Sequence, residues 1–268
     1  NVNDISIGES NYYPSANGES VHAFYYSPKN NQYNDNSGGL PPTIFLCHGG
    51  PTSATNRSLN FKIQFWTSRG FAVLDINYRG SSGFGREYRQ RLTNNWGIVD
   101  IQDIQHAAEY FSQKSKIDKS KCIIRGSSAG GFTVLSALTK LDVFKTGACL
   151  YGIGDLGKLA DDTHKFESNY LDSLIGDRID QSEDYKVRSP INHINNLNCP
   201  VIFFQGLEDM VVPPNQSQSM VDKLRQKKIK VEYVTFNDEG HGFKKANNIA
   251  YALQRELSFY LEIFYPET

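Results

Sequence analysis

The chain has 268 residues, of which 39% are hydrophobic and 21% charged, and 28 basic residues against 29 acidic ones give a formal net charge of -1. This balance offers no positive surface for a nucleic acid, and apolar runs such as Val201-Ile202-Phe203-Phe204 are far shorter than the roughly 18 residues of a membrane span. We therefore expect one globular domain over residues 1–268 that binds neither nucleic acid nor membrane.

The cysteines favour a reducing environment. Cys47, Cys122, Cys149 and Cys199 form no C-x-x-C pair, and each adjoins an apolar stretch. They are predicted to be buried free thiols, which favours a cytoplasmic location. The first residues lack the basic and apolar regions of a signal peptide, although a mature secreted protein or an excised domain would have the same start.

Short β-rich runs alternate with longer segments of helical period, and this alternation predicts an α/β protein with a mostly parallel sheet covered by helices on both faces. Residues 1–29 are predicted to form an edge hairpin, followed by a surface loop over 30–42. The predicted strands are Val21–Ser27, Thr43–Cys47, Phe71–Ile76, Cys122–Arg125, Gly147–Tyr151, Val201–Gln205 and Val231–Phe236. The predicted helices are Gly97–Lys114, Phe132–Leu141 and Ala246–Phe264. The region 152–199 is too long for a plain connection and is predicted to be a helical excursion near the active site.

The sharpest local pattern is Gly126-Ser127-Ser128-Ala129-Gly130, a G-x-S-x-G between a predicted strand and a predicted helix. This context is that of a nucleophile elbow, in which small residues on either side of the serine leave space for the crossing backbone. Ser128 is therefore the predicted nucleophile. Ser127 is the neighbouring alternative, but it lacks the flanking glycines in register.

A serine nucleophile needs a base and an orienting acid, which follow it in this order: acid, then histidine. Of the histidines after Ser128, His164 and His193 fall inside the irregular excursion, whereas His241 lies between the last strand and the last helix. His241 is the predicted base. The acid is expected just after the strand that ends at Gln205.

Two adjacent carboxylates occupy that position. Asp209 is the first choice for the acid and Glu208 is the alternative, since spacing alone does not separate them. Serine, acid and histidine each follow a predicted strand, which is where open α/β sheets build their sites.

The oxyanion of an acyl-transfer reaction needs two hydrogen-bond donors. The backbone N–H of Ala129 is expected to supply one, and that of Gly50, in His48-Gly49-Gly50-Pro51, the second. His48 itself is expected to pack against or orient this loop. No metal-ligand spacing and no phosphate-binding glycine pattern is present, so the sequence predicts neither a metal nor a cofactor.

These segments resemble the catalytic domain of the prolyl oligopeptidase family, in particular its acylaminoacyl-peptidase and dipeptidyl-peptidase-like branch. The resemblance extends from about Leu40 to the C-terminus. It rests on His48-Gly49-Gly50-Pro51-Thr52, Asn77-Tyr78-Arg79-Gly80-Ser81-Ser82-Gly83-Phe84-Gly85, Trp96-Gly97, Gly126-Ser127-Ser128-Ala129-Gly130-Gly131, residues 206–213 and Glu239-Gly240-His241-Gly242-Phe243.

The resemblance implies an α/β-hydrolase fold and a serine peptidase that hydrolyses short peptides, with Ser128, Asp209 and His241 as the triad. It also implies a substrate pocket, for which the candidates are Tyr151, Ile153, Leu156, Val211 and Val212. Family members usually carry an N-terminal β-propeller, for which 268 residues leave no space. We therefore expect either an excised catalytic domain or a relative without a propeller. A carboxylesterase with the same triad and a non-catalytic binding protein are the alternatives; the oligomeric state is left open.

Overall fold

An eight-stranded sheet forms the centre of the computed structural model, which describes residues 2–33, 38–162 and 165–266. The strand order is β1-β2-β4-β3-β5-β6-β7-β8. The first two strands form an antiparallel hairpin at one edge, β2 pairs antiparallel with β4, and the pairs from β4 through β3 to β8 are parallel. The strands are β1 Glu9–Pro14, β2 Ser20–Tyr26, β3 Thr43–Cys47, β4 Ala72–Asn77, β5 Cys122–Ser127, β6 Thr146–Leu150, β7 Val201–Gly206 and β8 Val231–Phe236.

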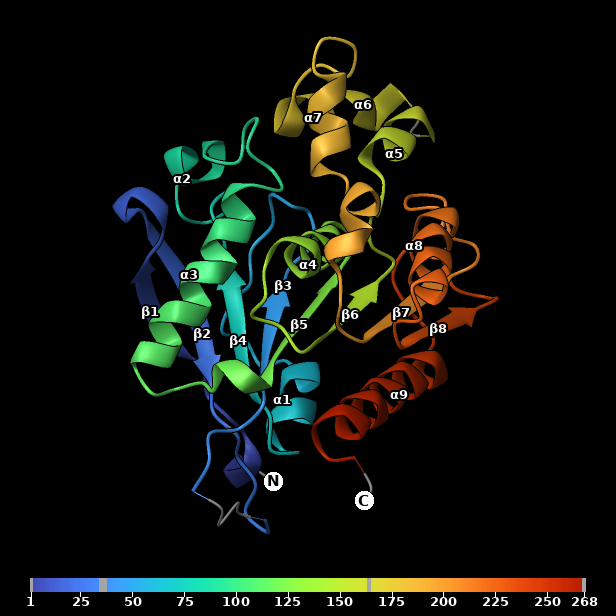
Figure 1. The fold of residues 1–268 in the computed structure, drawn as a ribbon. Coiled ribbons are helices and arrows are strands. Elements are labelled where there is room, and N and C mark those ends of the chain that lie inside the picture. The colour runs from blue at the N-terminus through green and yellow to red at the C-terminus, as the bar shows by residue number, and fades with distance from the viewer. Residues whose placement is uncertain (1, 34–37, 163–164, 267–268) are drawn as a thin grey trace.

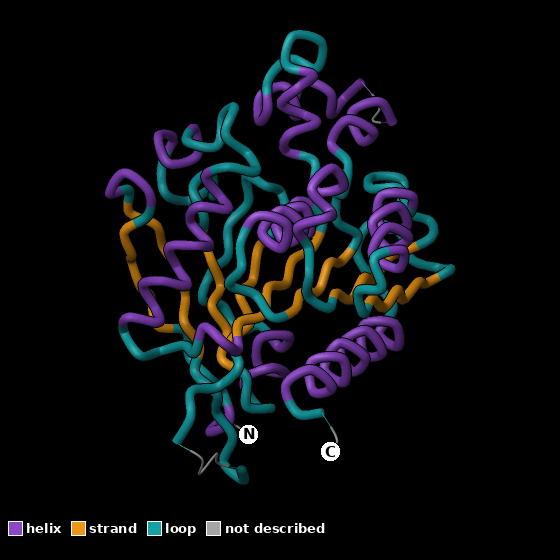
Figure 2. The backbone as a smooth tube through the Cα atoms, viewed as in Figure 1, coloured by secondary structure: helices purple, strands orange, loops and turns teal. Residues whose placement is uncertain are grey.

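Helices cover both faces of this sheet (Figures 1 and 2). The helices are α1 Phe61–Thr67, α2 Arg86–Gln90, α3 Val99–Gln113, α4 Ala129–Lys140, α5 Leu156–Asp162, α6 Lys165–Ile175, α7 Ser182–Arg188, α8 Asn215–Gln226 and α9 Ala246–Phe264. Short 3₁₀ turns, η1 to η4, lie at Val2–Asp4, Ala16–Gly18, Lys119–Lys121 and Pro190–Asn196. None of these helices combines the length and the apolar character needed to cross a membrane.

Both faces of the central strands are buried, because apolar residues follow one another along these strands instead of alternating with polar ones. In β7, Val201 and Phe203 pack with α3, α4 and α8 on one side, whereas Ile202 and Phe204 pack with α1 and α9 on the other. Successive side chains of a strand point to opposite faces, so a continuous apolar run serves both layers.

The predicted elements all form, with shifts at their ends. The bounds are those predicted for β3, β8 and α9, and β5 and α4 extend further toward the elbow than the sequence predicts. The strand predicted to end at Tyr151 ends at Leu150 instead, because Tyr151 adopts a φ of +39°, which a strand does not accommodate. The helix predicted from Gly97 begins at Val99, since Gly97 has a φ of +80°.

The region 152–199 contains α5, α6, α7 and η4, and the first three lie beyond the carboxyl ends of the strands (Figure 1). A separate apolar cluster packs this excursion against the rest of the domain. The buried members of that cluster are Leu92, Trp96, Val99, Ala129, Phe132, Ile153, Leu156, Leu159, Leu171, Leu174, Ile175, Tyr185 and Val212. The cluster therefore joins the excursion to the start of α4.

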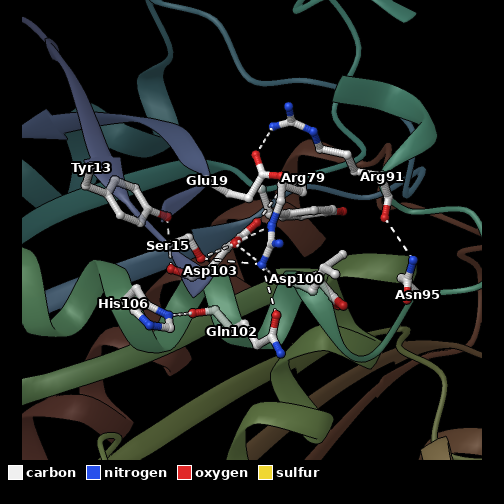
Figure 3. A network of polar contacts seen from close by, with 12 residues as sticks. Tyr13, Ser15, Glu19, Arg79, Arg91, Asn95, Asp100, Gln102, Asp103 and His106 are labelled. Carbon is white, nitrogen blue, oxygen red and sulfur yellow. Dashed lines mark hydrogen bonds and ion pairs between the residues drawn. The ribbon is translucent and has the colours of Figure 1, made fainter. Parts of the chain in front are cut away.

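A buried ion pair fastens the turn after β4 to α3 (Figure 3). The Arg79 guanidinium lies 2.8 Å from the Asp103 carboxylate, and the two side chains are 6% and 0% exposed. The same carboxylate also accepts hydrogen bonds from the Arg79 backbone N–H and the Ser15 hydroxyl, while the Tyr13 hydroxyl donates to the Asp103 carbonyl. The hairpin, the turn after β4 and α3 thus meet at one carboxylate.

Asp103→Asn is expected to lower the free energy of unfolding by about 3–5 kcal/mol, because it leaves the Arg79 guanidinium buried without a counter-charge. An arginine cannot escape this cost by losing its proton. The matched control is Glu9→Gln, which removes a partner of Lys116 at the partly exposed surface and should cost less than about 1 kcal/mol. Urea unfolding of both variants measures the difference, and equal losses would contradict the prediction.

Candidate active site

Ser128 lies at the sharp turn between β5 and α4, with φ of +56° and ψ of -123°. Its backbone N–H donates to the Leu150 carbonyl at 3.0 Å. The flanking glycines are needed because the backbone crosses closely here. A Cβ on Gly130 would lie 2.1 Å from the Cys47 carbonyl oxygen, and a Cβ on Gly126 would lie 2.4 Å from the Gly130 oxygen. The strained backbone at a non-glycine residue is typical of a functional site.

The Ser128 hydroxyl belongs to a hydrogen-bonded chain of three side chains. His241 Nε2 lies 2.9 Å from Ser128 Oγ, and His241 Nδ1 lies 2.8 Å from Asp209 Oδ2. Ser127 ends β5, opposite Leu150, and takes no part in this chain. His193 bonds to the Val187 carbonyl within the excursion, and His164 lies outside the described residues.

The turn after β7 decides which carboxylate meets His241. Asp209 is 1% exposed, and its Oδ1 accepts the backbone N–H groups of Val211 and Val212, each at 2.9 Å. Its Oδ2 is then left facing the imidazole. The Glu208 side chain is exposed, while its backbone N–H donates to the Glu239 carbonyl at 3.0 Å. The geometry therefore brings Asp209, and not Glu208, to His241.

A second buried carboxylate shapes the loop that carries His241. Glu239 is 2% exposed and accepts the backbone N–H groups of Lys244 and Lys245, each at 2.9 Å, and the Asn248 amide at 3.0 Å. Burial raises the pKa of Glu239, but these hydrogen bonds outweigh it and hold the pKa below its ordinary value. No motif in the sequence marks Glu239 for this role, because the groups that donate to its carboxylate meet it only in the folded loop.

Two backbone N–H groups are available beside the nucleophile. In the part of the chain that the structure describes, neither the Gly50 N–H nor the Ala129 N–H donates to a protein acceptor. Ala129 directly follows Ser128 at the start of α4. The loop that carries Gly50 also lies close, since a Cβ on Gly49 would be 3.6 Å from Ser128 Cβ. Unpaired N–H groups are rare in folded proteins unless a ligand or water meets them.

The five residues predicted to line a substrate pocket fall into two groups. Ile153, Leu156 and Val212 are 5%, 0% and 2% exposed and belong to the cluster beneath the excursion. Val211 is 45% exposed on the loop after Asp209. The Tyr151 ring packs edge-on against His241, with ring centroids 5.0 Å apart. Of these five residues, Tyr151 and Val211 are the two that offer surface beside the hydrogen-bonded chain.

No group of three or more His, Cys, Asp or Glu side chains within the described ranges is placed to hold a metal ion.

Comparison with known proteins agrees with this geometry. The model of the prolyl oligopeptidase family matches residues 57–266. The chain belongs to this family. Its sheet with helices on both faces is the α/β-hydrolase fold of the family, so the predicted fold class and the predicted family are both confirmed.

Its relatives include peptidases of different kinds. Dipeptidyl aminopeptidase BIII of Pseudoxanthomonas mexicana is 30% identical over 222 residues, which cover 80% of this chain and 32% of that protein. Acylamino-acid-releasing enzyme 1 of Oryza sativa subsp. japonica is 28% identical over 215 residues, which cover 76% of this chain and 28% of that protein. A puromycin-hydrolyzing peptidase of Mycobacterium tuberculosis has a similar structure, with a TM-score of 0.96, 41% identity, and coverage of 100% of this chain and 41% of that one. The chain thus spans about a third of the length of the curated relatives.

Glu239→Gln is expected to slow the labelling of Ser128 by a fluorophosphonate about 10- to 100-fold, because a displaced His241 loop misplaces the imidazole. An amide places a donor where the carboxylate now accepts, so the bonds from Lys244, Lys245 and Asn248 cannot all remain. The control is Asp238→Asn, which changes an exposed carboxylate bonded to Lys245 and Asn248 in the same loop. Labelling should be nearly unchanged in the control, and an equal loss in both variants would show that Glu239 has no special role.

Proposed function

We propose that this chain is the catalytic domain of a serine peptidase that hydrolyses short peptides through an acyl-enzyme on Ser128. The single observation that carries the proposal is the chain of hydrogen bonds from Ser128 through His241 to Asp209, at 2.9 and 2.8 Å. A serine hydroxyl is a weak nucleophile until an adjacent base accepts its proton. The geometry supplies such a base together with the carboxylate that orients it.

The roles follow from the bonding. His241 Nδ1 bonds to a carboxylate, which holds its proton there and leaves Nε2 as the acceptor for the Ser128 proton. As Ser128 Oγ attacks the substrate carbonyl, the proton passes to Nε2 and the Asp209 charge stabilises the resulting imidazolium. The free N–H groups of Gly50 and Ala129 are the proposed donors to the oxyanion.

Collapse of the tetrahedral intermediate completes the acylation step. The imidazolium gives its proton to the leaving amine, and the C–N bond breaks to leave the acyl group on Ser128. A water molecule then gives up a proton to His241 Nε2 as its oxygen attacks the acyl carbonyl. The ester C–O bond to Ser128 breaks, His241 returns the proton to Ser128 Oγ, and the acid is released. These steps are general to acyl transfer, and none requires a metal or a cofactor.

The relatives guide the proposed substrate class. Their names refer to dipeptidyl groups, acylamino acids and puromycin. We propose acylaminoacyl- or dipeptidyl-peptide amides as substrates, with Tyr151 and Val211 beside the acyl group. A cytoplasmic location stays a prediction, and so does the choice between an excised catalytic domain and a relative without a β-propeller.

Ser128→Ala is expected to leave the fold intact and to lower kcat on a dipeptidyl amide by about four to six orders of magnitude, because it removes the nucleophile. Ser127→Ala is the matched control from the same turn and should be nearly silent. Amide hydrolysis and fluorophosphonate labelling of both variants and the wild type provide the measurement. The reversed result would place the nucleophile at Ser127.

Two further outcomes of that experiment would contradict the proposal. A folded wild type that is not labelled would favour a binding protein. Turnover of esters without turnover of the matched amides would favour the carboxylesterase, which uses the same acyl-enzyme.

Asp209→Asn is expected to lower kcat on the order of 10⁴-fold, by analogy with the serine-protease template, because it removes the charge that stabilises the imidazolium. Glu208→Gln changes the adjacent carboxylate, whose side chain is exposed, and should cost far less. Measurement of both variants on one amide substrate tests the assignment. A larger loss in Glu208→Gln would move the acid one position upstream.

A further inference from the structure

A groove lies at the amino ends of the parallel strands, at the opposite end of the sheet from Ser128. Its volume is about 1320 Å³, and it is bounded by the segments after β2 and before β3, the turn between α1 and β4, and the end of α9 (Figure 1). Lys121 lines the groove and directly precedes β5, whereas Ser128 follows the last residue of β5. The length of this strand, roughly 20 Å, therefore separates the groove from the nucleophile.

The wall that α9 contributes is apolar. Leu257 and Leu261 line the groove together with Tyr265, which follows the last residue of the helix. Because these side chains are spaced four residues apart, they follow one face of the helix. Leu257 still packs against the apolar core beneath α9, but Leu261 is 41% and Tyr265 59% exposed. The apolar stripe of α9 thus extends past the core and forms part of the groove surface.

The charged residues that line the groove are all basic. Within the described part of the chain they are Lys29, Arg69 and Lys121, and no aspartate or glutamate lines the groove beside them. No described carboxylate forms an ion pair with Lys29 or Arg69. Lys121 donates to the Leu40 carbonyl at 3.1 Å, and the Asp118 carboxylate lies 3.9 Å from its ammonium group. The groove thus carries positive charge that described residues compensate only at Lys121, and a ligand with negative charges complements it.

Tyrosine and proline rings also face the groove. Tyr33, which is 75% exposed, and Tyr265 line it together with Pro28 and Pro41. Aromatic-lined grooves bind Pro-containing segments in the polyproline II (PPII) conformation, which is already extended before binding and therefore loses little entropy. The volume also exceeds the roughly 300–1,000 Å³ of a small-molecule pocket. An extended peptide thus suits the groove better than a compact ligand.

We propose that this groove binds an acidic, Pro-containing segment of a partner protein in the PPII conformation. Every third residue of a PPII helix lies on the same edge. Carboxylates on one edge of the segment meet the cations of Lys29 and Arg69, while apolar side chains on another edge pack against Leu261 and Tyr265. The choice of partner follows from the charge, because the groove offers cations and apolar surface to a ligand but no carboxylate.

A second copy of the chain and a membrane fit the groove less well. In a two-fold dimer the same surface of each copy faces the other, so Lys29, Arg69 and Lys121 would approach like charges. A bilayer presents a broad, flat surface, which does not enter a groove between a helix end and two loops.

The probe for this proposal is a fluorescein-labelled peptide of sequence Glu-Leu-Pro-Glu-Leu-Pro-Glu, which places glutamates on one edge of a PPII helix and leucines on another. Fluorescence anisotropy measures its binding to the Ser128→Ala variant of the full chain, so that the probe is not cleaved. We expect saturable binding with a Kd below about 1 mM, which weakens several-fold as salt rises from about 0.01 to 0.15 M. Absence of saturable binding would overturn the proposal.

Two control peptides separate the charge from the apolar contacts. Lys-Leu-Pro-Lys-Leu-Pro-Lys keeps the leucines and reverses the charge, whereas Glu-Ser-Pro-Glu-Ser-Pro-Glu keeps the charge and removes the leucines. Each should bind at least about 10-fold more weakly than the probe, because each lacks one of the two kinds of contact. A control that binds as tightly as the probe would count against the proposed ligand chemistry.

Substitutions in the groove locate the binding site. Lys29→Glu combined with Arg69→Glu should raise the Kd at least about 10-fold, because the reversed charges repel the glutamates of the probe. Leu261→Ser should raise it about 3- to 10-fold, because it removes apolar contact area. The matched control is Arg89→Glu, which reverses an exposed arginine on α2 and should leave the Kd unchanged. Unchanged binding in the groove variants, or an equal loss in the control, would place the peptide elsewhere.

Sedimentation experiments test the other occupants. A dimer of the wild-type chain that Arg69→Glu dissociates would assign the groove to a second copy and overturn the proposal. Binding to phosphatidylserine vesicles that the same variant abolishes would assign it to a membrane. Because none of these readouts depends on turnover, a chain that binds the probe but neither hydrolyses amides nor reacts with a fluorophosphonate would count against the proposed function alone.

Discussion

The close approach of two backbones at the elbow is the constraint on which the site depends. The turn between β5 and α4 lies against the end of β3, so closely that a Cβ on Gly130 would lie 2.1 Å from the Cys47 oxygen. This contact brings the strand that carries the serine next to the strand that leads into His48-Gly49-Gly50. Any side chain at Gly130 would separate them and move the Gly50 N–H away from Ser128.

The rest of the site is assembled from loops at the carboxyl ends of neighbouring parallel strands. The Glu208 N–H donates to the Glu239 carbonyl, so the loops after β7 and β8 contact each other. The Glu239 side chain accepts two backbone N–H groups of the segment that leads to α9. On the other side, the turn after β4 holds the loop after β3 through Tyr78 and Ser81. Each reacting group is thus supported by a neighbour that does not itself react, which is what preorganisation requires.

The sheet was predictable because continuous apolar runs of strand length serve two buried faces. The bounds of β3, β8 and α9 follow from the local pattern of apolar residues along the sequence. The predicted end of β6 and the predicted start of α3 were wrong, because Tyr151 and Gly97 have positive φ values that depend on the packing around them. The sequence did not predict the helices of the excursion one by one, because their apolar residues pack against residues from elsewhere in the chain, such as Trp96 and Phe132.

The sequence by itself determined the fold class, the family and the order of serine, acid and histidine, because these depend on local patterns and on the order of segments. Only the tertiary structure distinguished Asp209 from Glu208, which are adjacent and chemically alike. The backbone N–H groups of Val211 and Val212 fix the direction of Asp209, and no spacing in the sequence encodes that direction. The contribution of Glu239 was hidden for the same reason, because it depends on which N–H groups a folded loop brings within 3 Å of the carboxylate.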